Sequence, residues 1–209
     1  MQIDIVTLFP EMFSGVFDFS IIKRAREKGI VEINLVNLRG FATDKYKSVD
    51  DRPYGGGAGM VMRVDIIDKA IASVKGKKAK VILLDAGGKK FDQKKAIDLS
   101  RDEHLIIICG HYEGIDHRVH ERLADEVISI GDYVLSGGEI PAAVIVDAVV
   151  RLLPGALGNE ASLLEESHND GEAEYAQYTR PEEYKGWKVP EVLLSGDHAK
   201  IKRFRSPAR

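Results

Sequence analysis

The chain has 209 residues and a net charge of −3, with 44% hydrophobic and 30% charged residues, the composition of an ordinary globular protein with a buried core. Its single cysteine excludes an internal disulfide framework and a multi-cysteine zinc site, and it favours the reducing cytoplasm. We predict neither secretion nor membrane insertion. The first residues lack a signal-peptide pattern, and no run approaches the roughly 18–20 apolar residues of a membrane span.

The acidic charge is concentrated in one segment. Residues 152–179 hold six acids and no lysine or arginine, so the remainder has 30 basic and 27 acidic residues and a net charge of +3. That excess is too small to indicate nucleic-acid binding by itself.

The first third of the chain predicts two strands and two helices. Apolar patterns predict strands at 2–9 and 30–38, and helices from about 18 to 28 and from 64 to 75. The stretch at 39–60 is polar and then glycine-rich, so we expect a mobile loop with no regular element.

The central third holds three short apolar runs, each followed by a glycine-containing loop. They cover 80–88, 104–114 and 126–138, with helical patterns at 91–100 and 115–126 between them. Continuous β-branched runs are typical of strands buried on both faces of a parallel sheet. The sequence therefore predicts an α/β fold.

The last third changes character twice. The apolar helix expected at 140–153 has almost no polar face, so it must be buried on several sides, in part by a second subunit. We predict three regions: a main domain at 1–155, a flexible linker at 156–178 and a small appendage at 179–209. A terminal helix in the appendage would be capped near Ser195 or Asp197.

Glycine-rich loops after buried strands are candidate ligand sites, because open α/β sheets bind ligands beyond the carboxyl ends of their strands. Here those ends are 85–88, 110–114 and 131–138. Any one of them alone is most simply an ordinary turn. Three in succession favour a site where a flat ligand approaches the main chain closely.

Several other chemistries find little support. The chain has no GxGxxG after its first strand and no P-loop lysine, which disfavours Rossmann hydride transfer and P-loop phosphoryl transfer. His111, His117 and His120 lack an HExxH context, so we predict no metal site. Cys109 ends an apolar strand and is best explained as a small buried hydrophobe, with a nucleophilic role left open.

Five segments together resemble one known family. They are VDDRPYGGGAGM at 49–60, CGHYEGID at 109–116, IGDYVLSGGE at 130–139, QYTRP at 177–181 and VPEVLLSGDH at 189–198. They look like the bacterial tRNA (guanine-N1-)-methyltransferases of the TrmD family, and the likeness runs from LFPEMF near the start to about Arg205.

The resemblance implies a SPOUT-type fold, a mostly parallel sheet flanked by helices with a C-terminal trefoil knot and a short helical appendage. It implies a homodimer that transfers a methyl group from S-adenosylmethionine to N1 of guanosine 37 in tRNA. Two alternatives stay open: a SPOUT methyltransferase of another RNA position, and a non-catalytic RNA- or cofactor-binding module. Magnesium dependence also stays open.

Carried over position by position, the family's cofactor residues fall on the same three loops. Backbone groups would read the adenine edge and apolar side chains would cover its faces, while Glu113 or Asp132 would orient the ribose or the sulfonium. The implied set is Leu83, Leu84, Asp85, Ala86, Gly110, Tyr112, Glu113, Ile130, Gly131, Asp132, Tyr133, Val134, Leu135, Gly137, Gly138 and Pro141.

Methylation of guanine N1 needs a base, because that nitrogen carries a proton, and a cation to stabilise charge developing on O6. The resemblance assigns Glu166 as the base, Arg151 as the cation and Ser167 beside the carboxylate, where the family more often has Asp-Ser. Taken alone, Glu166 is a solvated acid, and Arg151 pairs with Asp147 one helical turn earlier. Two nearby acids are fallback bases, Asp170 and Glu174.

Basic clusters are the candidate tRNA contacts, because phosphates are met by lysine and arginine. The glycine-rich loop at 49–60 is a candidate lid. The alternative for each basic run is a solvated helix face. The chain stops soon after RFRSP, whereas the family usually continues into further helices. The basic residues are, first, Lys200, Lys202, Arg203 and Arg205, and then Lys23, Arg24 and Arg26.

Overall fold

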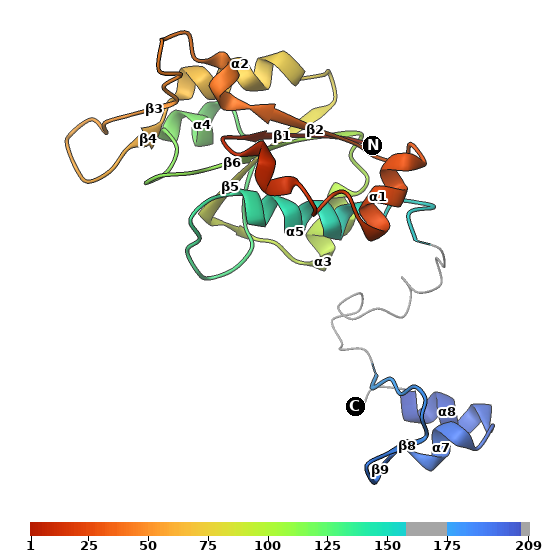
Figure 1. Cartoon of the computed structure of the whole chain (residues 1–209). Helices are drawn as coiled ribbons and strands as arrows, with labels where there is room; N and C mark the ends of the chain where they lie inside the picture. Colours follow the sequence, from red (N-terminus) through yellow and green to blue (C-terminus); the bar gives the residue numbers. More distant parts are fainter. Residues whose placement is uncertain (158–174, 206–209) are drawn as a thin grey trace. The chain divides into compact units, whose positions relative to one another are not determined.

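The computed structural model describes residues 1–157 and 175–205. The chain forms two compact units, Met1–Gly158 and Asn159–Arg209, which are coloured along the sequence in Figure 1. Among the described residues, no helix is both long enough and apolar enough to span a bilayer.

A five-stranded sheet forms the centre of the first unit. Its order is β2-β1-β6-β5-β7 and every neighbouring pair is parallel, so the carboxyl ends of all five strands lie along one edge. β6 is buried at every residue, which accounts for its uninterrupted apolar sequence. The strands are β1 (Gln2–Thr7), β2 (Glu32–Asn37), β5 (Ala79–Lys90), β6 (His104–Cys109) and β7 (Glu126–Ser129).

Helices cover both faces of this sheet (Figure 1). Alternate residues of each strand enter two separate clusters: Ile5 and Ile107 pack on the face that carries α1 and α5, whereas Val6 and Ile106 pack on the face that carries α2 and α4. The predicted α/β class is therefore confirmed. The helices are α1 (Ser20–Glu27), α2 (Val64–Val74), α3 (Gln93–Leu99), α4 (His117–Arg122) and α5 (Glu139–Val150).

Two expectations about loops were wrong. The stretch expected to lack regular elements contains most of the 3₁₀ helix η2 (Leu38–Phe41) and the strand β3 (Asp50–Asp51), which pairs with β4 (Val61–Met62). A second 3₁₀ helix, η1 (Pro10–Phe13), follows β1. These elements are too short to produce a recognisable hydrophobic period.

The glycine-containing loop predicted at the end of the first central run, at 85–88, is part of β5. β5 continues to Lys90, and its register with β7 shifts between Leu84 and Lys89, which marks a bulge. Gly88 permits the close approach, because a Cβ there would lie 2.7 Å from the backbone of Ile128. A glycine that ends a strand and a glycine within a bulge give the same sequence pattern.

The described part of the second unit is small and mostly exposed. Asp197 caps its last helix by accepting hydrogen bonds from the Ala199 and Lys200 amides, both at 3.1 Å, as the sequence predicts. A two-stranded hairpin and a preceding short helix were not predicted. The elements are β8 (Glu183–Tyr184), β9 (Trp187–Lys188), α7 (Glu191–Leu194) and α8 (His198–Arg205).

Candidate active site

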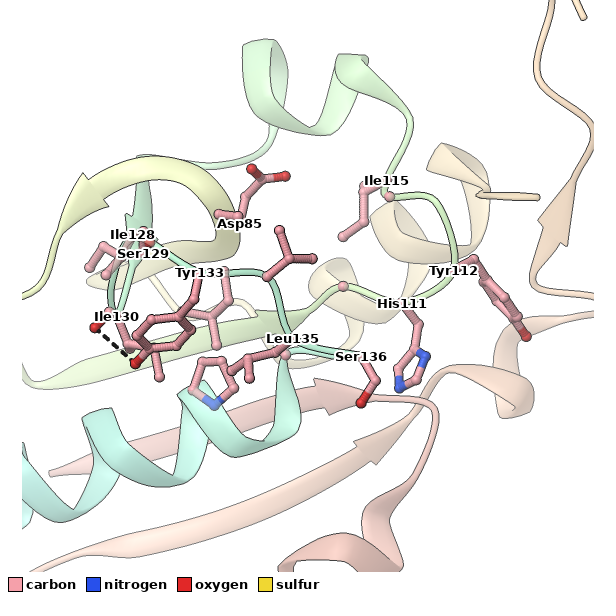
Figure 2. A pocket seen from close by; sticks show the side chains of 18 of the residues that line it. Asp85, His111, Tyr112, Ile115, Ile128, Ser129, Ile130, Tyr133, Leu135 and Ser136 are labelled. Atoms are coloured by element: carbon pink, nitrogen blue, oxygen red, sulfur yellow. Dashed lines mark hydrogen bonds between the residues drawn. The ribbon is translucent and has the colours of Figure 1, made fainter. Parts of the chain in front are cut away.

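A pocket opens at the carboxyl edge of the sheet, where the bulged part of β5 meets the segments that follow β6 and β7 (Figure 2). Its cavity volume is about 240 Å³, a little below the range of about 300–1,000 Å³ usual for small-molecule sites. Its lining consists of residues 84–86, 110–115, 128–131 and 133–138, together with Pro141. The position agrees with the general rule for ligands of open α/β sheets.

Backbone contacts hold two of these segments together. The Gly138 amide donates a 2.8 Å hydrogen bond to the Gly110 carbonyl. A Cβ on Gly138 would lie 2.6 Å from Cys109 Cα and 2.8 Å from the Gly110 nitrogen, closer than real Cβ atoms come to backbone. The floor of the pocket therefore requires glycine at position 138.

The segment after β7 forms an apolar wall. In Figure 2, Tyr133 and Leu135 lie beside each other, and the Tyr133 hydroxyl donates a 3.3 Å hydrogen bond to the Ile130 carbonyl. The Ser129 hydroxyl donates to the Gly131 carbonyl at 2.9 Å, which fixes the turn that follows β7. A wall of rings and aliphatic groups beside exposed main chain suits a flat heteroaromatic ligand.

Tyr112 has a strained backbone on the opposite wall, with a φ of 60°, and such strain in a non-glycine residue often marks a functional loop. Its side chain points away from Tyr133 and Leu135 (Figure 2), and the charges of Asp50 and Arg39 act on its phenol. Partial burial raises the pKa of the Tyr112 phenol, and the charge of Asp50 raises it further. The segment after β6 is thereby connected to the β3–β4 hairpin.

The same segment contacts the glycine-rich loop through its backbone. The Glu113 amide donates to the Met60 carbonyl at 3.1 Å, and the Met62 amide donates to the Gly114 carbonyl at 3.0 Å. The side chain of Glu113 packs directly over Gly59, where a side chain would collide with it. The glycine-rich loop is therefore attached to the pocket wall, and its role as a lid stays a prediction.

Asp85 occupies the rim of the pocket (Figure 2). Its Oδ1 accepts a 2.7 Å hydrogen bond from the Gly87 amide, and its Oδ2 lies 3.3 Å from His120 Nε2 on α4. His120 is thus a partner of a pocket residue. The described part of the chain holds no cluster of three or more His, Cys, Asp or Glu side chains suited to a metal ion.

The structure brings most of the predicted cofactor residues together around this one pocket. Two of them do not reach it: Leu83 is fully buried inside β5, and Asp132 has an exposed side chain that pairs with Lys90 at 2.5 Å. The predicted residues that line the pocket are Leu84, Asp85, Ala86, Gly110, Tyr112, Glu113, Ile130, Gly131, Tyr133, Val134, Leu135, Gly137, Gly138 and Pro141.

Of the predicted catalytic residues, Glu166 and Ser167 lie outside the described residues, as do the fallback acids Asp170 and Glu174. Arg151 is half-buried at the C-terminal end of α5, with its amide bonded to the Asp147 carbonyl at 3.2 Å.

The residue-by-residue assignment left out six lining residues. Three of them, His111, Gly114 and Ser136, lie within the strand-end loops that the sequence predicts as candidate ligand sites at 110–114 and 131–138. The other three, Ile115, Ile128 and Ser129, carry no local signal that singles them out.

Cys109 ends β6 beneath the pocket and is fully buried. Burial raises the pKa of its thiol well above the usual value, and the nearby Glu139 charge adds to the effect. A thiol in this environment stays protonated at neutral pH and is a poor nucleophile. The structure therefore favours the packing role for Cys109.

Comparison with known proteins decides the family. The family model described as tRNA (Guanine-1)-methyltransferase TrmD matches residues 1–209. The chain belongs to this family. It is 58% identical over 205 residues to the tRNA (guanine-N(1)-)-methyltransferases of Carboxydothermus hydrogenoformans and Dictyoglomus turgidum, covering 98% of this chain and 81% and 83% of theirs. The Bacillus subtilis relative is 53% identical over 209 residues, covering 99% of this chain and 86% of its own.

Proposed function

We propose that the chain transfers a methyl group from S-adenosylmethionine to N1 of guanosine 37 in tRNA. It is an enzyme of the tRNA (guanine-N1)-methyltransferase class, to which its family and its relatives belong. The observation that supports the cofactor site most strongly is the convergence of three strand-end segments on one pocket. We propose the cytoplasm as its location, because the substrate is tRNA.

The pocket supports a nucleoside-containing methyl donor. Tyr133, Leu135 and Pro141 offer apolar surface for an adenine ring, and the adjoining glycine segments bring main chain close to its edge. S-adenosylmethionine supplies an electrophilic methyl group when bound. Around it, the role of this chain is to orient the donor and to exclude water from the path of the methyl group.

Removing the N1 proton requires a carboxylate near the bound base. We propose Glu166 for this role, with Ser167 beside it and Arg151 stabilising the negative charge that develops on guanine O6. Arg151 follows the C-terminal end of α5, about 15 Å along the helix axis from the pocket residue Pro141 in the first turn. Glutamate in place of the more common aspartate sets the base one methylene further from the backbone.

An exposed apolar surface supports a homodimer. Two of its residues belong to the η1 region: Phe9, just before η1, is 37% exposed, and Met12, within η1, is 45% exposed. The other two lie on the outer side of α5, where Ile140 is 53% exposed and Val144 is 44% exposed. η1 packs against α5, so we propose that these four residues form one face that a second copy covers.

The C-terminal unit supports tRNA binding. Helix α8 ends in basic side chains, including Lys202, Arg203 and Arg205, which suit a phosphate backbone. Trp187 and Tyr184 on the neighbouring hairpin are 72% and 54% exposed, and exposed rings of this kind stack on unpaired bases. We propose this unit as the principal tRNA contact.

One assay tests the proposed reaction. The chain is incubated with methyl-labelled S-adenosylmethionine and a tRNA transcript carrying guanosine 37, or the same transcript with adenosine 37, and then with the Glu166→Gln variant. The proposal predicts label only on the guanosine 37 transcript, and a loss of at least about 100-fold in kcat for Glu166→Gln.

The other outcomes are equally informative. Label on both transcripts would show that another RNA position is modified, and cofactor binding without transfer would indicate a non-catalytic module. Unchanged turnover by Glu166→Gln would refute the choice of base. Repeating the assay with EDTA in place of magnesium measures any requirement for that ion.

A further inference from the structure

One carboxyl group is almost completely buried beneath the pocket and has no part in the chemistry proposed above. Glu139 is 1% exposed and occupies the first turn of α5. Its Oε1 accepts a 2.7 Å hydrogen bond from the hydroxyl of Thr7, at the end of β1. The same hydroxyl accepts a 3.0 Å hydrogen bond from the Phe9 amide, so its donor hydrogen is directed to Glu139.

The second oxygen of this carboxyl group faces the pocket wall. Glu139 Oε2 has no hydrogen-bond partner among the described residues, and the His111 Nε2 atom lies 3.3 Å away. A buried carboxylate needs donors or a counter-charge, because removing it from water is costly. His111 Nε2 is the nitrogen placed to serve this oxygen. The ring of His111 is also packed edge-on against Phe9, with centroids 4.9 Å apart.

Gly137 lies close to this group and also lines the pocket. A Cβ at Gly137 would lie 2.6 Å from Glu139 Oε2 and would also collide with the His111 ring. Both Gly137 and His111 line the pocket; in Figure 2, His111 lies beside Ser136, the residue that precedes Gly137. Glu139 therefore sits directly behind the point where the segments after β6 and β7 meet.

We propose that Glu139 is a positioning residue for the cofactor pocket: held by Thr7 and paired with His111, it fixes the 110–114 segment against the 136–138 turn before the cofactor binds. This inference rests on the proposed function, because it assigns the residue to the S-adenosylmethionine site. Glu139 does not touch the reacting atoms. A pocket arranged in advance binds its ligand without first ordering two loops, so the pairing should act on affinity and leave the methyl-transfer step unaffected.

Thr7 offers a matched pair of variants. Thr7→Val keeps the shape of the side chain and removes the hydroxyl, which leaves the buried carboxyl without its donor, whereas Thr7→Ser keeps the hydroxyl. We expect Thr7→Val to raise the Kd for S-adenosylhomocysteine and the KM for S-adenosylmethionine about tenfold, with kcat at saturation changed by less than about twofold. Thr7→Ser should restore wild-type affinity.

If the contact between Thr7 and Glu139 were purely structural, Thr7→Val would lower the melting temperature and leave the Kd of the folded protein for S-adenosylhomocysteine unchanged. Calorimetric titration well below that temperature separates the two roles, and equal Kd values for the valine and serine variants would overturn the inference. If the wild-type chain does not bind S-adenosylhomocysteine, the proposed function fails instead.

A second variant keeps the test valid if Thr7→Val does not fold. His111→Asn changes a partly exposed side chain and removes the ring nitrogen that faces Glu139. We expect His111→Asn to weaken the affinity for S-adenosylhomocysteine about tenfold. Where Thr7→Val folds, the loss of affinity in the double variant should be smaller than the product of the two single losses, because both act through Glu139. Unchanged affinity in His111→Asn, or strictly multiplicative effects, would contradict the pairing.

Discussion

The glycine at position 138 gives the sharpest test of how the pocket is built. In Gly138→Ala, the new Cβ would lie 2.6 Å from Cys109 Cα and 2.8 Å from the Gly110 nitrogen. Both are backbone atoms of β6 and its exit, so no side-chain rotation relieves the contact. The start of α5 must move away from the segment after β6, which strains or breaks the 2.8 Å hydrogen bond from the Gly138 amide to the Gly110 carbonyl.

Overpacking of this kind costs about 1–3 kcal/mol, which corresponds to a fall in melting temperature on the order of 5 °C for a unit of this size. Because the displaced backbone lines the pocket, we expect the Kd for S-adenosylhomocysteine to rise about 10- to 100-fold. Differential scanning fluorimetry measures the first effect and isothermal titration calorimetry the second.

Gly40→Ala is the matched control. A Cβ at Gly40 meets no atom within 4 Å, and the residue does not have a positive φ, so the same substitution should leave both quantities unchanged. Wild-type affinity in Gly138→Ala would refute the claim that this contact forms the floor of the cofactor pocket.

Three further predictions concern other parts of the molecule. Ile140→Asp should convert the proposed dimer to monomer in analytical ultracentrifugation, because a charge replaces an exposed apolar contact; a dimer that persists would contradict the proposed face. The double variant Lys202→Glu with Arg203→Glu should weaken tRNA binding at least about tenfold and reduce its salt dependence, with cofactor affinity unchanged. Loss of cofactor affinity would contradict the assignment of tRNA binding and cofactor binding to different units. The side-chain hydrogen bond from Arg118 lowers the pKa of Asp116 below its usual 3.8. This stabilisation is present above that value and is lost as pH falls through the lowered pKa, so Asp116→Asn should lower the melting temperature at pH 7 and have less effect near pH 3. A fall in melting temperature that is equal at pH 7 and pH 3 would contradict the stabilising role of the Asp116 carboxylate.

Much of the fold can be predicted because the parallel sheet is buried on both faces. The run at β6 contains no polar residue between Leu105 and Cys109, and only a central strand or a buried helix tolerates that pattern. The bulge in β5 could not be predicted, because Gly87 and Gly88 are equally compatible with a turn. The two-residue strands β3 and β4 depend on one another and have no local period of their own.

The location of the candidate site could be predicted from the sequence. The buried contacts behind the pocket could not. Three glycine-rich strand ends identify the edge where the pocket forms. The hydrogen bond between Thr7 and Glu139 joins residues 132 positions apart, and nothing in the local sequence of either residue points to the other. Glu139 looks like an ordinary acid at a helix N-terminus, and only the packing of β1 against the start of α5 shows that it is buried.

A crystal structure of the chain with S-adenosylhomocysteine tests the central claim most directly. We predict ligand density at the carboxyl edge of the sheet, with the adenine against Tyr133 and Leu135 and its edge toward the main chain near Gly110. The surface also has a larger hollow at the opposite end of the sheet, lined in part by Gln2, Arg26 and Glu32. Density there, with the pocket between the three segments left empty, would contradict the account.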